Sequence, residues 1–290
     1  MEYRSQTIAD YELNGFRGKS ENTKKTYVNE LELFEIWLDD KGSTLEDFTF
    51  VELQQYMNFH KRLDAKASTI KKKFNSIRHF CNYKGVIHKC EDIDVIKSES
   101  NLPAPKSLSR NERNAMLREA SKKGNRDYAI ICFLLYTGVR VEECSNVEIR
   151  HLFDIGDKKG FVRIVGKGNK ERVIPLNSDV RLALKLYLQE RDINIYDGKS
   201  LELHSYEPLF ISTHRKKVSA RRIQQIVKDT GKTHPHALRH TFGTILIRDK
   251  KVDPVIVAQL LGHANLNTIQ RYTQATLEER LIIVEDMEDE

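Results

Sequence analysis

The part of the chain that decides the fold reads HALRHTFGTILIRDK over residues 236–250 and DPVIVAQLLGH over residues 253–263. Apolar residues recur at helical spacing in the first stretch, which predicts a helix over its whole length. The second stretch begins with Asp253 and Pro254 and ends in Leu-Gly-His, so it carries an N-cap, a first-turn proline and a C-terminal glycine. We therefore expect two helices, with His263 at the exit of the second.

Six side chains suited to phosphate chemistry follow one another along the chain. They are Arg140, Lys167, His236, Arg239, His263 and Tyr272. His236 and Arg239 are three residues apart on the first predicted helix, so both project from one face and can address one phosphate together. Tyr272 comes nine residues after His263.

The residue types fit the cutting of a phosphodiester. A guanidinium donates two parallel hydrogen bonds to non-bridging phosphate oxygens, so two arginines and two imidazoles form an anion clamp that needs no metal. A phenol, with a reference pKa of about 10, must lose its proton as it attacks. His236 is the candidate base for this step. Lys167 is the candidate acid that protonates the departing sugar oxygen.

Each of these residues also has an ordinary structural interpretation. Arg140 could pair with Glu142 or Glu143, His236 could cap a helix, and His263 could be a core histidine. Lys167 could be a solvated lysine in a glycine-rich turn. Because six positions agree in residue type, order and local context, the set together favours the functional interpretation.

The six positions resemble the tyrosine recombinase (phage integrase) family, which includes Xer-like and transposon- or phage-encoded site-specific recombinases. The resemblance covers nearly the whole chain. It implies an enzyme that breaks and rejoins DNA through a covalent phosphotyrosine. Glu143 and His240 match family positions that support the active site. Cys144 and Gly243 depart from the usual residues, and we interpret both as packing changes.

The chain is expected to form two domains. Residues 1–98 show helical spacing, and residues 99–107 are a polar, proline-containing linker. The resemblance implies that residues 1–98 are a core-type DNA-binding domain and that residues 108–290 are the catalytic domain with a C-terminal oligomerisation tail. Alternating patterns over residues 160–165 and 172–176 predict an antiparallel hairpin that carries Lys167 in its turn. The expected fold is mainly α with a small antiparallel sheet, and the resemblance implies a two-domain, C-shaped DNA clamp.

Two groups of basic residues are candidate DNA contacts. They are Lys71, Lys72 and Lys73 in the first domain, and Arg221 and Arg222 in the second. A charge run is also typical of a solvated helix face. The resemblance favours contact with phosphate for the lysines, and for the arginines both interpretations stay open.

Composition agrees with a nucleic-acid partner. The net charge is +6 and the sequence pI about 9.0, which favours a polyanion. No apolar run is long enough to span a bilayer, and the N-terminus lacks the apolar core of a signal peptide, so we expect a cytoplasmic, nucleoid-associated protein. The four cysteines show no Cys-x-x-Cys pair and are expected to be reduced structural thiols, with no metal site and no cofactor.

After Tyr272 the chain continues through an apolar strip and an acidic end over residues 276–290. The resemblance implies that this tail contacts a neighbouring protomer, although folding back on its own domain is an equal alternative. The expected partners are duplex DNA with inverted-repeat core sites, a homotetramer assembled on that DNA, and accessory DNA-bending proteins. No membrane partner is expected.

The sequence thus predicts a site-specific DNA recombinase that acts through a 3′-phosphotyrosyl intermediate in integration, excision or resolution. Two alternatives remain: a type IB topoisomerase-like enzyme, and a DNA-binding accessory factor without catalysis. The motifs do not separate integrases, resolvases and chromosome-dimer resolving enzymes. Side chains that contact mostly phosphate do not reveal a target sequence.

Overall fold

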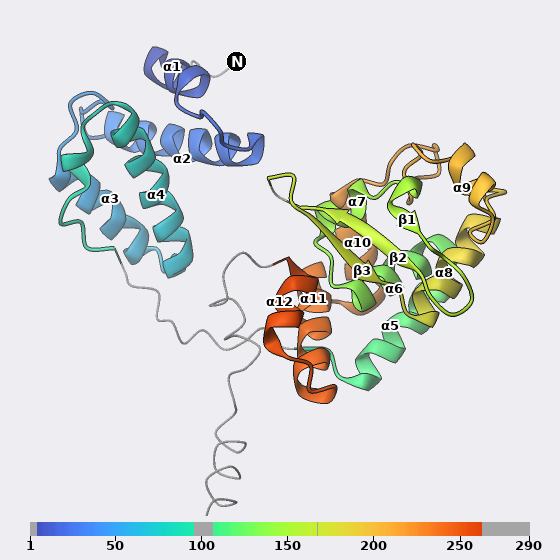
Figure 1. Cartoon of the computed structure of the whole chain (residues 1–290). Helices are drawn as coiled ribbons and strands as arrows, with labels where there is room; N and C mark the ends of the chain where they lie inside the picture. The colour runs from blue at the N-terminus through green and yellow to red at the C-terminus, as the bar shows by residue number, and fades with distance from the viewer. Residues whose placement is uncertain (1–4, 96–106, 167, 263–290) are drawn as a thin grey trace, which may run out of the picture. The chain divides into compact units, whose positions relative to one another are not determined.

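The structure is a computed structural model of the 290-residue chain, and it describes residues 5–95, 107–166 and 168–262. The chain divides into two compact units, Met1–Leu102 and Pro103–Glu290 (Figure 1). Each unit has its own hydrophobic core. Three of the predicted catalytic residues, Lys167, His263 and Tyr272, lie outside the described residues, as do the C-terminal tail and nearly all of the predicted linker.

The first unit is helical. Its elements are α1 (Gln6–Asn14), α2 (Glu21–Asp39), α3 (Phe50–Arg62), α4 (Ala67–Tyr83) and the 3-10 helix η1 (Ile87–Cys90). A capping box between Thr49 and Glu52 begins α3, with each side chain bonded to the backbone N–H of the other residue. Aromatic rings fill the core, where Phe34 lies edge-on to Phe48 and tilted against Tyr56.

The second unit combines helices with three strands. Its elements are α5 (Arg110–Lys122), α6 (Asn125–Thr137), α7 (Val141–Asn146), η2 (Ile149–His151), β1 (Leu152–Phe153), β2 (Phe161–Val165), β3 (Glu171–Pro175), α8 (Ser178–Gln189), α9 (Gly198–Leu203), α10 (Ala220–Gly231), α11 (Pro235–Thr244), η3 (Ile245–Asp249) and α12 (Pro254–Leu261). The predicted class, mainly α with a small antiparallel sheet, is confirmed.

Helix α6 forms the centre of the second unit. Its residues 129–135 are all apolar and buried, and it packs against α5, α8 and α11. The helix ends at Gly138, whose φ of 62° is left-handed. A Cβ atom there would lie 2.4 Å from the ring of Phe242 in α11, so this turn requires glycine for its conformation and for its close packing. The turn leads directly to Arg140.

The three strands form an antiparallel sheet in the order β1-β2-β3, and β2 and β3 form the predicted hairpin. Val162 of β2 pairs with Ile174 of β3, and both side chains face the core. The backbone N–H of Gly166 donates to the carbonyl of Lys170 at 2.8 Å and closes the base of the turn.

The predicted helix over residues 236–250 is divided in the structure. Helix α11 ends at Thr244, and one π-helical turn, η3, follows it. The wider turn places Leu246 and Ile247 against Val257 and Leu261, so packing against α12 offsets the poorer helical geometry. The caps predicted for α12 are confirmed, because the Asp253 carboxylate accepts from the N–H of Val255 and Gly262 is left-handed with φ of 65°.

All four cysteines are buried and carry free thiols, as predicted for structural residues. Within the described parts of the chain, no helix has both the length and the apolar character needed to cross a membrane.

Candidate active site

Arg140 begins the candidate site at the first turn of α7. Its backbone is extended at the N-cap position, which ends the turn that follows α6. The Arg140 N–H donates to Oε2 of Glu143 at 2.8 Å, and its guanidinium Nη1 donates to Oε1 at 2.9 Å. The Arg140 side chain remains 37% exposed, so its guanidinium can also reach a ligand in solvent.

Glu143 is the buried centre of the charge network. Besides the two bonds from Arg140, it accepts Nη1 and Nη2 of Arg172 at 3.0 and 2.7 Å, so its four lone-pair positions are used. Burial alone would raise the pKa of Glu143. The hydrogen bonds from Arg172 and Arg140 and the two positive charges outweigh burial and hold the pKa at about 2. Glu143 is therefore an anion throughout the neutral range.

Arg239 is buried on α11 and connects the ends of two helices. Its Nη1 donates to the carbonyl of Gly138 after α6, and its Nη2 donates to the carbonyl of Leu261 in the last turn of α12, both at 2.6 Å. The guanidinium is thereby held in a defined position beside the turn that carries Arg140.

His236 lies within electrostatic reach of both arginines. Burial lowers its pKa, and the electrostatic effects of Arg239, His234 and Arg140 lower it further, against a smaller opposite effect of Glu142. A lowered pKa leaves the imidazole neutral at pH 7, the form that can accept a proton. The N-cap of α11 is His234, whose Nδ1 accepts from Ala237, so the capping role that we considered for His236 belongs to His234.

His240, predicted to support the site, is buried on α11, and its Nδ1 lies 3.2 Å from the hydroxyl of Thr244 one turn later. Of the six predicted catalytic residues, the structure brings together Arg140, His236 and Arg239, and Glu143 holds Arg140 in this group. The catalytic roles of Lys167, His263 and Tyr272 stay predictions, because these residues lie outside the described part of the chain.

Arg172 belongs to this network, although the sequence analysis considered it only as part of a strand. Its side chain is 11% exposed and makes the paired contact with Glu143 described above. One sequence signal could have found it: Arg172 alternates with Ile174, so it lies on the side of β3 that faces the core. A charged residue on that side requires a buried partner.

The predicted DNA contacts occupy different environments. Lys71, Arg221 and Arg222 are exposed, and Lys72 is exposed while its amine lies 2.6 Å from Glu30. Lys73 points inward, where its amine donates to Glu30 at 2.7 Å and lies 5.8 Å from the centre of the Tyr56 ring. The structure contradicts the prediction that Lys73 contacts DNA. Its ammonium is buried and bound to the Glu30 carboxylate, so it stabilises the packing of the first unit.

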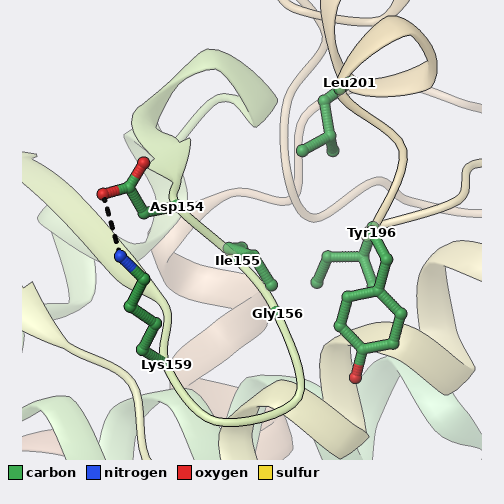
Figure 2. Close-up of a pocket in the computed structure, with 8 residues that line it drawn as sticks. Asp154, Ile155, Gly156, Lys159, Tyr196 and Leu201 are labelled. Atoms are coloured by element: carbon green, nitrogen blue, oxygen red, sulfur yellow. Dashed lines mark ion pairs between the residues drawn. The ribbon is translucent and has the colours of Figure 1, made fainter.

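A surface cleft of about 350 Å³ lies in another part of the second unit, between the loop after β1 and the segment leading into α9 (Figure 2). Its lining includes Ile155, Tyr196 and Leu201, and Lys159 lies 3.7 Å from Asp154 at its edge. No arginine or histidine lines this cleft, so it lacks the groups for a phosphate clamp.

Known proteins match almost the whole chain. Residues 106–279 match the phage integrase family, and residues 8–85 match its N-terminal SAM-like domain. Tyrosine recombinase XerC of Staphylococcus epidermidis is 31% identical over 92% of this chain and 90% of the relative. Tyrosine recombinase XerC of Listeria monocytogenes is 30% identical over 94% of this chain and 93% of the relative.

Solved structures show the same fold at lower identity. XerH site-specific recombinase bound to a palindromic difH substrate has a TM-score of 0.73 at 20% identity, over 94% of this chain and 82% of that one. A lambda integrase tetramer bound to a Holliday junction has a TM-score of 0.67 at 19% identity, over 92% and 76% of the two chains. Together with the family match and the XerC relatives, this shows that the chain belongs to the phage integrase family and is a Xer-like tyrosine site-specific recombinase.

Proposed function

We propose that this recombinase cuts a DNA strand by attack of Tyr272 on the scissile phosphate, leaving a 3′-phosphotyrosyl enzyme and a free 5′-hydroxyl. The observation that carries the proposal is the convergence of Arg140, which Glu143 holds, Arg239, which binds the carbonyl of Gly138 two residues before Arg140, and a neutral His236 within electrostatic reach of both arginines. These groups come from the start of α7 and from α11, and a phosphate requires this combination of forked donors and a proton acceptor.

Arg140 and Arg239 stabilise the negative charge that develops on the non-bridging oxygens. Their positions are set before DNA binds, because Glu143 holds the first guanidinium and two backbone carbonyls hold the second. Donors that are already oriented need no reorganisation as charge develops. His263, three residues after Leu260, is proposed to add a further donor to the same phosphate.

Protons move in opposite directions at the two ends of the reaction. The bond from the Tyr272 oxygen to phosphorus forms while the bond from phosphorus to the 5′-oxygen breaks. The tyrosine proton passes to His236, and Lys167 donates a proton to the departing 5′-oxygen. In the reverse direction a 5′-hydroxyl from the partner duplex attacks the phosphotyrosine. The ester conserves the bond energy, so we propose that no ATP is required. We also propose that the clamp of arginines and histidines makes a divalent metal unnecessary.

The test is the covalent adduct. Wild-type protein incubated with its site in excess EDTA is expected to form a protein–DNA adduct that resists denaturation, and Tyr272→Phe is expected to bind the site without forming the adduct. An adduct formed by Tyr272→Phe, or a strict requirement for added Mg²⁺, would contradict the proposal. Sequencing the DNA recovered in wild-type adducts would identify the target.

The role of Lys167 can be separated from the clamp. Sulfur at the 5′-bridging position leaves as a thiolate, which needs no proton. Lys167→Ala is therefore expected to cut this modified site at nearly the wild-type rate and an ordinary site slowly. Arg140→Ala and Arg239→Ala should stay slow on both, because they act on the non-bridging oxygens. Equal defects of Lys167→Ala on both substrates would reduce Lys167 to a phosphate contact.

Recombination requires two duplexes, so we propose that four copies assemble on inverted-repeat core sites, with DNA-bending proteins as accessory factors and a cytoplasmic, nucleoid-associated location. The tail after Gln274 is the proposed contact between copies. Truncation there should leave half-site binding intact and weaken the cooperative filling of full sites in gel-shift titrations. A lower melting temperature with weaker half-site binding would instead show that the tail folds back on its own domain.

Membership of the family favours recombination over a type IB topoisomerase-like activity or a silent DNA-binding factor. Relaxation of supercoiled plasmid lacking any recombination site would favour the topoisomerase. Binding without an adduct in the wild-type protein would favour the silent factor.

A further inference from the structure

We propose that Arg172 is a positioning residue of this active site, which orients Arg140 through Glu143 and joins both to the last turn of α12. The inference rests on the proposed cleavage chemistry and names a residue to which that chemistry assigns no role. Within the described part of the chain, the Arg172 side chain binds Glu143 and the carbonyl of Leu260, so we infer that it acts through Glu143.

The contacts of Arg172 account for each nitrogen of its guanidinium. Nη1 and Nη2 bind the two carboxylate oxygens of Glu143 at 3.0 and 2.7 Å, and Nε donates to the carbonyl of Leu260 at 2.8 Å. A paired contact of this kind fixes the plane of the carboxylate as well as its distance. Glu143 can then present Oε1 to Arg140 Nη1 in one orientation only.

Arg172 also connects parts of the site that are far apart in the sequence. Leu260, whose carbonyl it binds, directly precedes Leu261, whose carbonyl accepts from Arg239. Two arginines from β3 and α11 therefore hold adjacent carbonyls at the end of α12. The same Arg172 lies five residues after Lys167 in sequence, and Leu260 lies three residues before His263.

Gly262 allows close packing against Arg172, and Gly166 lies near the same contact. A Cβ atom on Gly262 would lie 3.0 Å from Arg172 Nη1, and its left-handed φ of 65° also disfavours other residues. A Cβ atom on Gly166 would lie 3.5 Å from Glu143 Oε1 and 3.6 Å from Arg172 Nη1. The backbone at Gly262 thus packs tightly against the Arg172 guanidinium, and at Gly166 there is room for ordinary van der Waals contact only.

A lysine cannot reproduce these contacts. Its ammonium could neutralise Glu143, but it lacks the planar fork that binds both carboxylate oxygens and reaches Leu260 at the same time. We therefore expect Arg172→Lys to restore part of the function lost in Arg172→Gln, because it retains the charge without the geometry. Loss of charge and loss of orientation can be told apart in this way.

The experiment measures single-turnover adduct formation on a suicide half-site at saturating protein. Arg172→Gln is expected to slow cleavage by about 100-fold with little change in DNA affinity, because misplacement of a catalytic group by about an ångström has an effect of that size. Arg172→Lys should lie between Arg172→Gln and the wild type. A loss of affinity without a slower cleavage step would overturn the proposal.

A double mutant tests whether Arg172 acts through Arg140. In an Arg140→Ala background, Arg172→Gln should slow cleavage by less than threefold further, because the group that it orients is already absent. A site with a methyl group in place of one non-bridging oxygen carries less charge and depends less on the clamp, so the defect of Arg172→Gln should shrink on that site. Full additivity of the two substitutions, or an unchanged defect on the methylated site, would refute the proposal.

Arg191 provides a matched control. It is equally buried, it donates to the carbonyls of Pro208 and Leu209, and its Nη2 binds Glu207 at 2.7 Å, but none of these residues belongs to the candidate site. Arg191→Gln should lower the melting temperature without slowing cleavage by the folded protein. An equal cleavage defect in Arg191→Gln and Arg172→Gln would show that only general stability is involved. If the wild type forms no adduct, the proposed function itself fails, which is a separate outcome.

Discussion

Each unit of the protein contains a buried glutamate between two cations, and the two networks serve different ends. In the first unit, Glu30 binds the amines of Lys72 and Lys73 at 2.6 and 2.7 Å. In the second, Glu143 binds the guanidiniums of Arg140 and Arg172 at 2.9 and 2.7 Å. In both, hydrogen bonds and positive charge outweigh burial and lower the pKa of the carboxyl.

The difference lies in what the cations can still do. Lys73 is buried against Tyr56, so its charge interacts only with groups inside the first unit. Arg140, at the start of α7, keeps more than a third of its side chain exposed to solvent. A lysine ammonium is a point charge, while an arginine fork fixes the orientation of a carboxylate. Pairing a cation with a buried carboxylate can thus stabilise a core or orient the cation toward a ligand.

The largest expected effect separates the exposed cation from the buried one. Arg140→Ala should slow the cleavage step by about 10³-fold, because it removes a donor to the developing phosphate charge. Lys73→Met should leave cleavage by the folded protein unchanged. Single-turnover adduct assays at saturating protein measure both. A cleavage defect in Lys73→Met as large as that of Arg140→Ala would contradict the claim that only the second network acts in catalysis.

Removal of either glutamate should destabilise its own unit. Glu30→Gln and Glu143→Gln each leave a buried cation without its counter-charge, which costs about 3 kcal/mol. The chain's single tryptophan, Trp37, packs against Phe34 and Tyr56, so its fluorescence reports unfolding of the first unit. Glu30→Gln should shift that transition. Glu143→Gln should leave the tryptophan transition unchanged and shift only the unfolding followed by circular dichroism, which sums the helices of both units. Coincident shifts in both variants would contradict independent networks.

Acid should weaken the second unit through Glu143. Its folded pKa of about 2 lies below the ordinary value of 4.5, so its stabilisation is complete above pH 4.5 and is lost as pH falls toward 2. By pH 3 the loss should reach about 2 kcal/mol. Urea unfolding at pH 7 and pH 3 measures it, and Glu143→Gln should lack this part of the pH dependence. An identical pH dependence in the variant would show that Glu143 is not the titrating group.

The smallest expected effect compares two left-handed glycines. Gly85 and Gly262 have φ of 73° and 65°, but a Cβ atom meets nothing within 4 Å at Gly85 and lies 3.0 Å from Arg172 at Gly262. Alanine at either position should cost about 1 kcal/mol through its conformation. Only Gly262→Ala should also slow cleavage, because it displaces Arg172. Thermal melts and adduct assays measure the two effects, and normal cleavage by Gly262→Ala would show that the guanidinium can move without consequence.

Local patterns in the sequence were sufficient for much of the fold and for part of the site. The capping box at Thr49, the proline and glycine that bound α12, and the hairpin of β2 and β3 depend on residues within a few positions of one another. The spacing of His236 and Arg239 likewise follows from one helical turn. Such contacts are formed within a single element, so the sequence determines them directly.

Only the tertiary structure decided the partners of the buried charges. Lys73 meets Glu30 across 43 residues and Arg172 meets Glu143 across 29, and neither pairing follows from helical or strand spacing. In the sequence, a run of three lysines indicates a basic surface. In the structure, α4 packs on α2, and this packing buries one of the three, Lys73. Residue types specified the chemistry of this recombinase, while burial decided which charges stabilise the core and which orient the clamp, because the need for a counter-charge arises only once packing excludes water.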